Sequence, residues 1–157
     1  LSASGVNDVT YVNAPSLSQE RGLVASVTTS GDSPDHRNMV FLSGALSNGE
    51  RVSVAGTLMG IKRVEKIVEI DGLDVDVAFS DHLLFLRYTD RPGVVGSVGN
   101  ALGKADINIA GMQVARASAG GDALMAITVD STVSDAIVAA VSKETGAELV
   151  RSVTLVG

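Results

Sequence analysis

The sequence predicts an α+β protein made of two small domains, because strand patterns fill its first half and helices alternate with strands in its second. Residues 1–81 hold short runs of alternating apolar and polar side chains, separated by turn residues. Residues 82–157 give the order strand, helix, strand, strand, helix, strand. With 157 residues, of which 45% are hydrophobic, the chain has enough apolar surface to bury a core.

Composition narrows the functions that this chain can have. It has no cysteine and only His36 and His82, so neither a disulfide framework nor a zinc-binding pattern is expected. The net charge of −6 and the 3% of aromatic residues argue against nucleic-acid binding. No apolar run approaches the ~20 residues of a membrane span. We expect a cytoplasmic protein without a metal site, and Leu1 in place of Met suggests a piece of a longer chain.

The first predicted helix is short and lies near the start of the chain. Asn13 is a good N-cap residue, Pro15 suits the first turn, and Gly22 suits the end. The β-branched run 23–29 that follows predicts a strand.

Two hairpins are predicted next. The runs 39–46 and 51–59 flank Asn48-Gly49, a strong hairpin signal, and the alternation in the second run predicts one buried face. That face holds Val52, Val54 and Leu58. The second hairpin joins 64–70, through Asp71-Gly72, to a strand in which apolar and acidic residues alternate. Its apolar positions are Val75, Val77 and Phe79.

The second half opens on a strand, 82–88, that runs into an Asp-x-Pro-Gly turn at 90–93 and then into a helix, 93–105. Free backbone N–H groups and the carboxylate of Asp90 therefore meet at a helix N-terminus. The N–H groups and the helix dipole suit a carboxylate, and Asp90 suits an ammonium group. An amino acid carries both groups, so the turn predicts an amino-acid site, although a plain N-cap role for Asp90 is the alternative.

The predicted helix 93–105 carries an apolar stripe that faces a sheet and a second stripe of glycines. Its apolar positions are Val94, Val95, Val98, Ala101, Leu102 and Ala105, and its glycines are Gly93, Gly96, Gly99 and Gly103. Interior glycines cost a helix ~1 kcal/mol each relative to alanine, so they indicate close approach of a neighbouring helix or a second subunit. Their spacing is not that of a dinucleotide-binding loop.

The remaining elements complete the alternating order. Strict alternation in 107–116 would place Asn108 and Met112 on one face and Ile109 on the other. A strand over 122–130, a helix over 134–145 and a strand over 148–156 follow, and the strand over 122–130 carries a clean apolar face. The members of that face are Ala123, Met125, Ile127 and Val129. Asp106, before the first strand, is expected to adopt a left-handed turn.

These patterns resemble two known families. Residues 82–157 are similar to an ACT domain, a ferredoxin-like βαββαβ module that senses small ligands. Val12-Asn13-Ala14-Pro15 and Glu20-Arg21-Gly22 resemble the segment after the catalytic part of long-form D-3-phosphoglycerate dehydrogenases, whose intervening domain residues 1–81 match in outline. The resemblance implies a regulatory fragment of an enzyme that uses NAD, with no cofactor and no catalytic residues in the fragment itself.

The resemblance also implies an effector site shared between two subunits. Asp90 would pair with the ammonium group of the effector, Asn108 of the adjoining subunit would bridge its ammonium and carboxylate groups, and Tyr88 would add a carbonyl or hydroxyl oxygen. Backbone N–H groups at Gly93, Val94 and Val95 would hold the carboxylate. The implied partners are L-serine, or another small amino acid such as glycine, and a second copy of the chain in a homodimer or tetramer.

The first domain departs from the pattern of its relatives. Of three basic positions that hold an anion in the family, Lys66 is retained, while the other two fall on Ala78 and Thr128. Losing two cations removes most of what would bind a phosphate, since each charge-assisted hydrogen bond contributes roughly 1.5–3 kcal/mol. We therefore expect no phosphorylated effector here, unless cations elsewhere substitute. Those cations are Lys62, Arg63 and Arg87.

The predicted function is feedback regulation by L-serine bound at the seam of an ACT dimer. The sequence leaves two alternatives to this function open. In the first, the chain is an oligomerisation module with a non-functional pocket. In the second, it is the regulatory part of an L-serine dehydratase, which carries similar domains.

Overall fold

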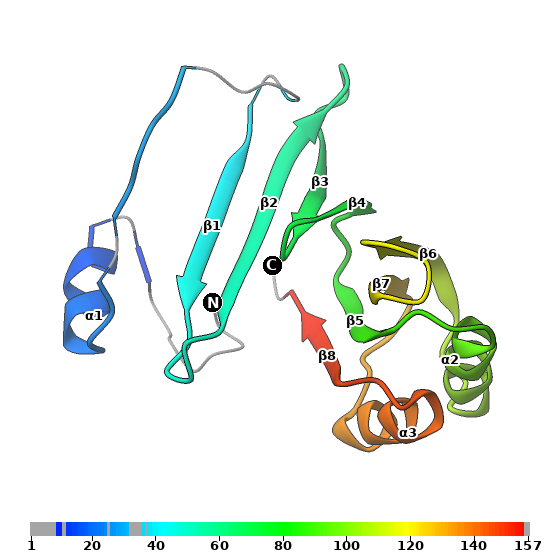
Figure 1. Cartoon of the computed structure of the whole chain (residues 1–157). Helices are drawn as coiled ribbons and strands as arrows, with labels where there is room; N and C mark the ends of the chain where they lie inside the picture. Colours follow the sequence, from blue (N-terminus) through cyan, green and yellow to red (C-terminus); the bar gives the residue numbers. More distant parts are fainter. Residues whose placement is uncertain (1–8, 11, 25, 32–35, 37, 156–157) are drawn as a thin grey trace.

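The computed structural model describes residues 9–10, 12–24, 26–31, 36 and 38–155, arranged as two antiparallel sheets and three helices (Figure 1). The first sheet has the order β1-β2-β3-β4, and the second has the order β6-β7-β5-β8. The strands are β1 (Val40–Ala45), β2 (Arg51–Met59), β3 (Val64–Ile70), β4 (Leu73–Ala78), β5 (His82–Thr89), β6 (Ile109–Arg116), β7 (Asp122–Val129) and β8 (Leu149–Thr154). The helices are α1 (Ala14–Glu20), α2 (Val94–Lys104) and α3 (Asp135–Thr145). The α+β prediction is confirmed.

Both predicted hairpins form. Gly49, with a φ of 84°, lies in the turn between β1 and β2, where the Leu46 N–H bonds to the Glu50 carbonyl at 2.8 Å. Asp71 and Gly72 join β3 to β4 with φ values of 50° and 77°, the two successive positive angles that a type I′ turn requires. The Asn-Gly and Asp-Gly pairs therefore mark these turns correctly.

The N-terminal segment follows the prediction for the helix but not for the strand. The helix α1 begins after Asn13, and Gly22 follows its end with a φ of 69°. Residues 23, 24 and 26–29 form no strand, and Val24 and Val27 are fully exposed. β-Branched residues favour a strand only when a neighbouring strand and a packing surface are present, and the described segment has neither.

The buried face predicted for β2 is wrong. Val52 and Leu58 are 39% and 41% exposed, whereas Thr57 is 7% exposed and its hydroxyl donates to the backbone carbonyl of Asn38. Val54, the third member of the predicted face, is partly buried against a hydrophobic core. The register shift between Ala55 and Gly56 has its extra residue, Val68, in β3, so it leaves the alternation of β2 itself unchanged.

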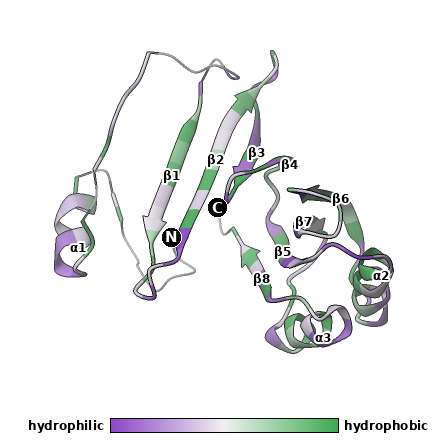
Figure 2. Cartoon of the chain, in the orientation of Figure 1, coloured by the Kyte–Doolittle hydropathy of each residue, from purple (hydrophilic) through white to green (hydrophobic). Residues whose placement is uncertain are grey.

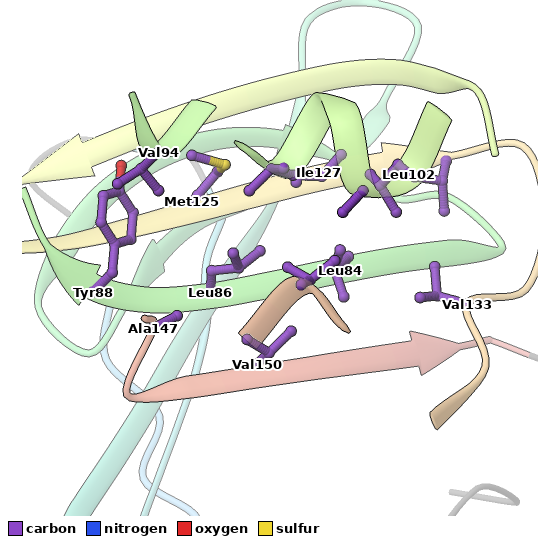
Figure 3. Close-up of a cluster of buried hydrophobic side chains, with 14 of the residues drawn as sticks. Leu84, Leu86, Tyr88, Val94, Leu102, Met125, Ile127, Val133, Ala147 and Val150 are labelled. Atoms are coloured by element: carbon purple, nitrogen blue, oxygen red, sulfur yellow. The ribbon is translucent and has the colours of Figure 1, made fainter. Parts of the chain in front are cut away.

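The main core lies between the second sheet and the helices α2 and α3 (Figure 3). The predicted apolar face of β7 is confirmed there, since its four members are at most 2% exposed. The buried core side chains include Leu84, Leu86, Val98, Leu102, Met125, Ile127 and Val141. Full burial of such side chains stabilises the fold by about 1.5–3 kcal/mol each.

A smaller core joins the opposite face of the second sheet to the first sheet. Ile67 from β3 and Val75 and Val77 from β4 pack with Leu83 and Leu124. The strand β5 therefore sends alternate side chains into two cores, Leu84 and Leu86 to one and Leu83 and Phe85 to the other.

The strict alternation predicted along β6 is also wrong. Ile109 and Met112 both pack against the helix-side core, although the prediction placed them on opposite faces. A register shift between Ile109 and Gly111 accounts for this. Asp106, just upstream, has the predicted left-handed conformation with a φ of 57°.

Part of the first sheet has an uncovered apolar surface. Every residue of β1 is exposed, and Val40, Phe41 and Leu42 are 65%, 51% and 62% exposed. Figure 2 shows hydrophobic positions along this strand and its neighbour β2. A groove of about 470 Å³ runs from Leu42 and Val54 to Phe85 on the second sheet.

Candidate functional site

The turn after β5 is held beside the turn that joins β6 to β7. The Asp90 N–H bonds to the Gly121 carbonyl at 2.8 Å, which places the Asp90 carboxylate under the 117–121 turn. There its Oδ2 accepts from Arg116 Nη1 at 2.9 Å and from the Gly120 N–H at 3.4 Å. The hydrogen bond from Arg116, followed by that from Gly120, lowers the pKa of Asp90, so this carboxylate is a fixed negative charge.

The N-cap residue of α2, Gly93, follows Asp90 by three residues. Gly93 is the N-cap residue, and its φ of 91° lets the chain turn sharply into the helix. Val94 is 2% exposed and anchors the first turn in the core, while Val95 is 49% exposed. The first N–H groups of a helix have no intrahelical acceptor and lie at the positive end of its dipole. This turn can therefore accept a carboxylate.

Tyr88 lies directly below this turn. It is only 3% exposed, and Figure 3 shows its ring rising from β5 toward Val94. Within the described part of the chain its hydroxyl has no hydrogen-bond partner, which is unusual for a buried polar group. Burial, and then the charge of Asp90, raises the pKa of Tyr88, so the hydroxyl stays protonated and can donate or accept.

Asn108 lies at the opposite end of the second sheet. Its Nδ2 donates to Asp130 Oδ2 at 2.7 Å, and the Asp130 N–H bonds back to the Asn108 carbonyl at 3.2 Å. Asp90 is next to the start of β7, and Asn108 is next to its end. Eight residues of strand span about 26 Å. One chain therefore brings Tyr88, Asp90 and the α2 N-terminus together but leaves Asn108 far away.

Two arginines at this end of the sheet were not predicted as site residues. Arg116 pairs with Asp90, and Arg91 Nη2 donates to the Thr145 carbonyl at 2.5 Å, at the C-terminal end of α3. The partners are 26 and 54 residues apart in sequence, so no local spacing reveals them. Arg91 ties the site turn to α3, where a cation suits the negative end of the helix dipole.

The three positions of the family anion site do meet in this chain. Lys66, Ala78 and Thr128 line one cavity of about 330 Å³, between the β3–β4 hairpin and β6 and β7. Lys66 Nζ lies 2.5 Å from Asp76 Oδ1, so its charge is already neutralised. None of the proposed substitute cations lines this cavity, and Arg87 instead pairs with Glu50 at 3.6 Å. The arrangement favours no strongly charged anion.

The pairing of the described strands and the distribution of their acidic and histidine side chains bear on cofactor and metal binding. All paired strands are antiparallel, whereas dinucleotides bind where parallel strands diverge next to a glycine-rich turn. No cluster of three His, Asp or Glu side chains in the described chain could hold a metal ion. The helices seen here are also too short or too polar to cross a bilayer.

Comparison with known proteins shows which family and which enzymes this chain resembles. Residues 82–146 match the model of the ACT domain. The chain is 41% identical to the D-3-phosphoglycerate dehydrogenase of Mycobacterium leprae, over 85% of this chain and 26% of that protein. It is 37% identical to the enzyme of the same name from Bacillus subtilis, over 83% and 24%, and 32% identical to that from Synechocystis, over 88% and 24%.

The chain thus spans about a quarter of the length of the curated relatives it matches. A crystal structure of an unknown protein from Galdieria sulphuraria covers 48% of this chain and 44% of its own, with a TM-score of 0.41 and 20% identity, which is too weak to support an argument.

Proposed function

Residues 82–146 belong to the ACT domain family, and from this premise we propose that the chain is the part of a D-3-phosphoglycerate dehydrogenase that senses L-serine. L-serine would bind where the turn after β5 meets a second copy of the chain. Binding there would favour an inactive arrangement of the catalytic domains, which are outside this chain. The intact protein would be a cytoplasmic, NAD-dependent enzyme of L-serine synthesis.

The observation that carries the proposal is the set of groups around the α2 N-terminus. An ionised carboxylate at Asp90, free N–H groups at Val94 and Val95, and the unpaired hydroxyl of Tyr88 lie within eight consecutive residues. They offer partners for the ammonium, the carboxylate and the hydroxyl of one small amino acid. A plain N-cap role for Asp90 is not supported, because its carboxylate bonds to Arg116 and Gly120 and not to the helix.

A second copy is supported by two uncovered features on the same side of the domain. The strand β6 is an edge of its sheet, and an unpaired edge favours association with another strand. Side chains added at Gly96, Gly99 or Gly103 on α2 would meet nothing within 4 Å among the described residues. The neighbouring-helix explanation of the glycine stripe is therefore wrong, and close contact with a second copy is the explanation that remains.

Symmetry explains how Asn108 reaches the site. When two copies of β6 pair antiparallel about a two-fold axis, the start of one strand lies against the end of the other. An axis that passes between the two copies of Gln113 would set Ala110 of one copy opposite Arg116 of the other. Asn108 would then lie beside the Asp90 turn of the second copy, and each dimer would hold two equivalent sites.

Feedback regulation by a ligand at this interface needs a coupling free energy of known size. Feedback requires a coupling free energy of about 1–3 kcal/mol between the effector and the arrangement of the subunits, equal in both directions for binding. The hydrogen bond from Arg91 to the Thr145 carbonyl links the site turn to α3, so a change in the turn on ligand binding can reach α3.

A purely structural role is the second candidate function, and one observation favours it. Asp90 already has a cationic partner in Arg116, so its carboxylate is paired within a single chain without any ligand. The host enzyme is better supported as a dehydrogenase than as an L-serine dehydratase, because the relatives compared above carry the dehydrogenase name.

Calorimetric titration of the 157-residue chain with L-serine, glycine, L-alanine and D-serine tests the proposal. We expect L-serine to bind at about one molecule per chain and to raise the Tm, since a ligand at 100 times its Kd adds ~2.7 kcal/mol to stability. Asp90→Asn should lose at least tenfold in affinity. Asp122→Asn, which removes an exposed carboxylate from the start of β7, is the matched control and should bind like the parent.

Two outcomes would contradict the sensing function. One is the absence of both heat and a Tm shift with millimolar amounts of every amino acid in the panel. The other is unchanged affinity in Asp90→Asn. Preference for glycine over L-serine would retain the sensor and correct the effector.

A further inference from the structure

We propose that Arg116 is a built-in competitor of the effector: its guanidinium occupies Asp90 in the free chain and must leave that carboxylate before an ammonium group can bind there. The inference rests on the proposed function and assigns to Arg116 the setting of the affinity of the site.

The contact has the geometry that competition requires. Arg116 Nη1 donates to Asp90 Oδ2 at 2.9 Å, and the Gly120 N–H donates to the same oxygen at 3.4 Å. A guanidinium and an ammonium are both cations with hydrogen-bond donors only, so they seek the same acceptor. The Asp90 side chain is 18% exposed, which leaves little room for two cations on its accessible side.

The ion pair between Arg116 and Asp90 is also weak enough to be displaced. The Arg116 side chain is 57% exposed, so water and salt screen its pairing with Asp90 and can solvate the guanidinium when it leaves. Displacement of Arg116 therefore weakens effector binding without blocking it. Arg116 also ends the edge strand β6, so its release alters the side-chain arrangement at the edge that a second copy would cover.

Competition predicts that removal of the cation makes the site bind more tightly. We expect Arg116→Gln to bind L-serine about two- to fivefold more tightly than the parent chain, which is the upper part of the range set by an exposed ion pair. Arg116→Lys keeps a competing cation and should bind like the parent. Arg87→Gln is the matched control, because Arg87 is a partly exposed arginine paired with Asp122 at 3.9 Å on the neighbouring strand.

Titration calorimetry of these four proteins with L-serine separates the outcomes. Equal or weaker binding by Arg116→Gln would overturn the inference, because Arg116 would then orient Asp90 or hold the ligand carboxylate. Comparable tightening in Arg87→Gln would also overturn it, since the effect would come from net charge alone.

The same experiment distinguishes this inference from the sensing function. If the parent chain binds no amino acid but Arg116→Gln does, competition is supported and the proposed function fails, because the native pocket is closed. If neither protein binds, both proposals fail. If the parent binds and Arg116→Gln does not bind more tightly, the sensing function stands and the competitor role falls.

Discussion

At the residue scale, Tyr88 and Asp90 show how two neighbouring polar groups acquire different properties. Tyr88 faces the helix-side core and is 3% exposed, so burial keeps its hydroxyl neutral. Asp90 lies beyond the strand end, beside Arg116 and the Gly120 N–H, so its carboxylate stays charged. A neutral donor next to a fixed negative charge suits a ligand that carries both a hydroxyl and an ammonium group.

The lowered pKa of Asp90 predicts a specific pH dependence. Its carboxylate should stay ionised below its ordinary pKa of 3.8. Its contribution to stability is therefore full above the pKa of the unfolded chain and is lost as the pH falls through the lower folded value. Arg116→Gln should raise that folded value, so the loss should begin at a higher pH. Carboxyl carbon shifts followed by NMR measure both midpoints, and equal midpoints would contradict the assigned cause.

The sequence predicts some single residues of the site well and others not at all. The left-handed Asp106 and the helix-opening Gly93 follow from local backbone chemistry, which a short window of sequence contains. The partner of Asp90 does not, because Arg116 is brought to it by the pairing of β6 with β7. The in-chain bond of Asn108 to Asp130 was missed for the same reason.

At the element scale, turns were predicted more reliably than strand faces. An Asn-Gly or Asp-Gly pair determines its own backbone angles, so both hairpins are visible in the sequence. The register shift in β6 depends on how neighbouring strands fit together, although Gly111, which lies at the shift, is a local sign of it. Strict alternation therefore placed Met112 on the wrong face.

The turn between β3 and β4 gives a stability prediction. Gly72 has a φ of 77° with nothing within 4 Å of an added Cβ, so Gly72→Ala would suffer backbone strain and no clash. We expect the free energy of unfolding to fall by about 1–2 kcal/mol, as measured by urea denaturation. Gly44→Ala is the control, because Gly44 also has open space but lacks a positive φ. Equal losses in the two variants would exclude strain as the cause.

At the scale of the whole molecule, the order of elements was predicted and the exposed surface of the first sheet was not. Alternating strand and helix patterns determine the βαββαβ order, since each helix must cover the sheet formed by its flanking strands. The exposed apolar surface of β1 was not predicted. The sequence of β1 has the pattern of an ordinary half-buried strand. Whether its side chains are buried depends on an element that covers them, and no pattern within the strand can show that element.

The free edge of β6 gives a prediction about assembly. Val114 is 40% exposed on this edge strand, so Val114→Lys should cost the single chain little stability. In a two-fold β6 pair the two lysines would lie close together and repel each other. We expect size-exclusion chromatography with light scattering to show a shift toward monomer, together with loss of L-serine binding. A dimer that persists with full binding would locate the interface elsewhere.

The strand β5 has a mechanical consequence. Its C-terminal end leads into the Asp90 turn, while its two faces pack against separate cores, with Leu83 and Phe85 in the smaller one. An extended strand is stiff along its axis, and packed cores resist compression. A small displacement of Asp90 along the strand axis would therefore shift β5 as a rigid unit. The displacement would reach Leu83, and through it the first sheet.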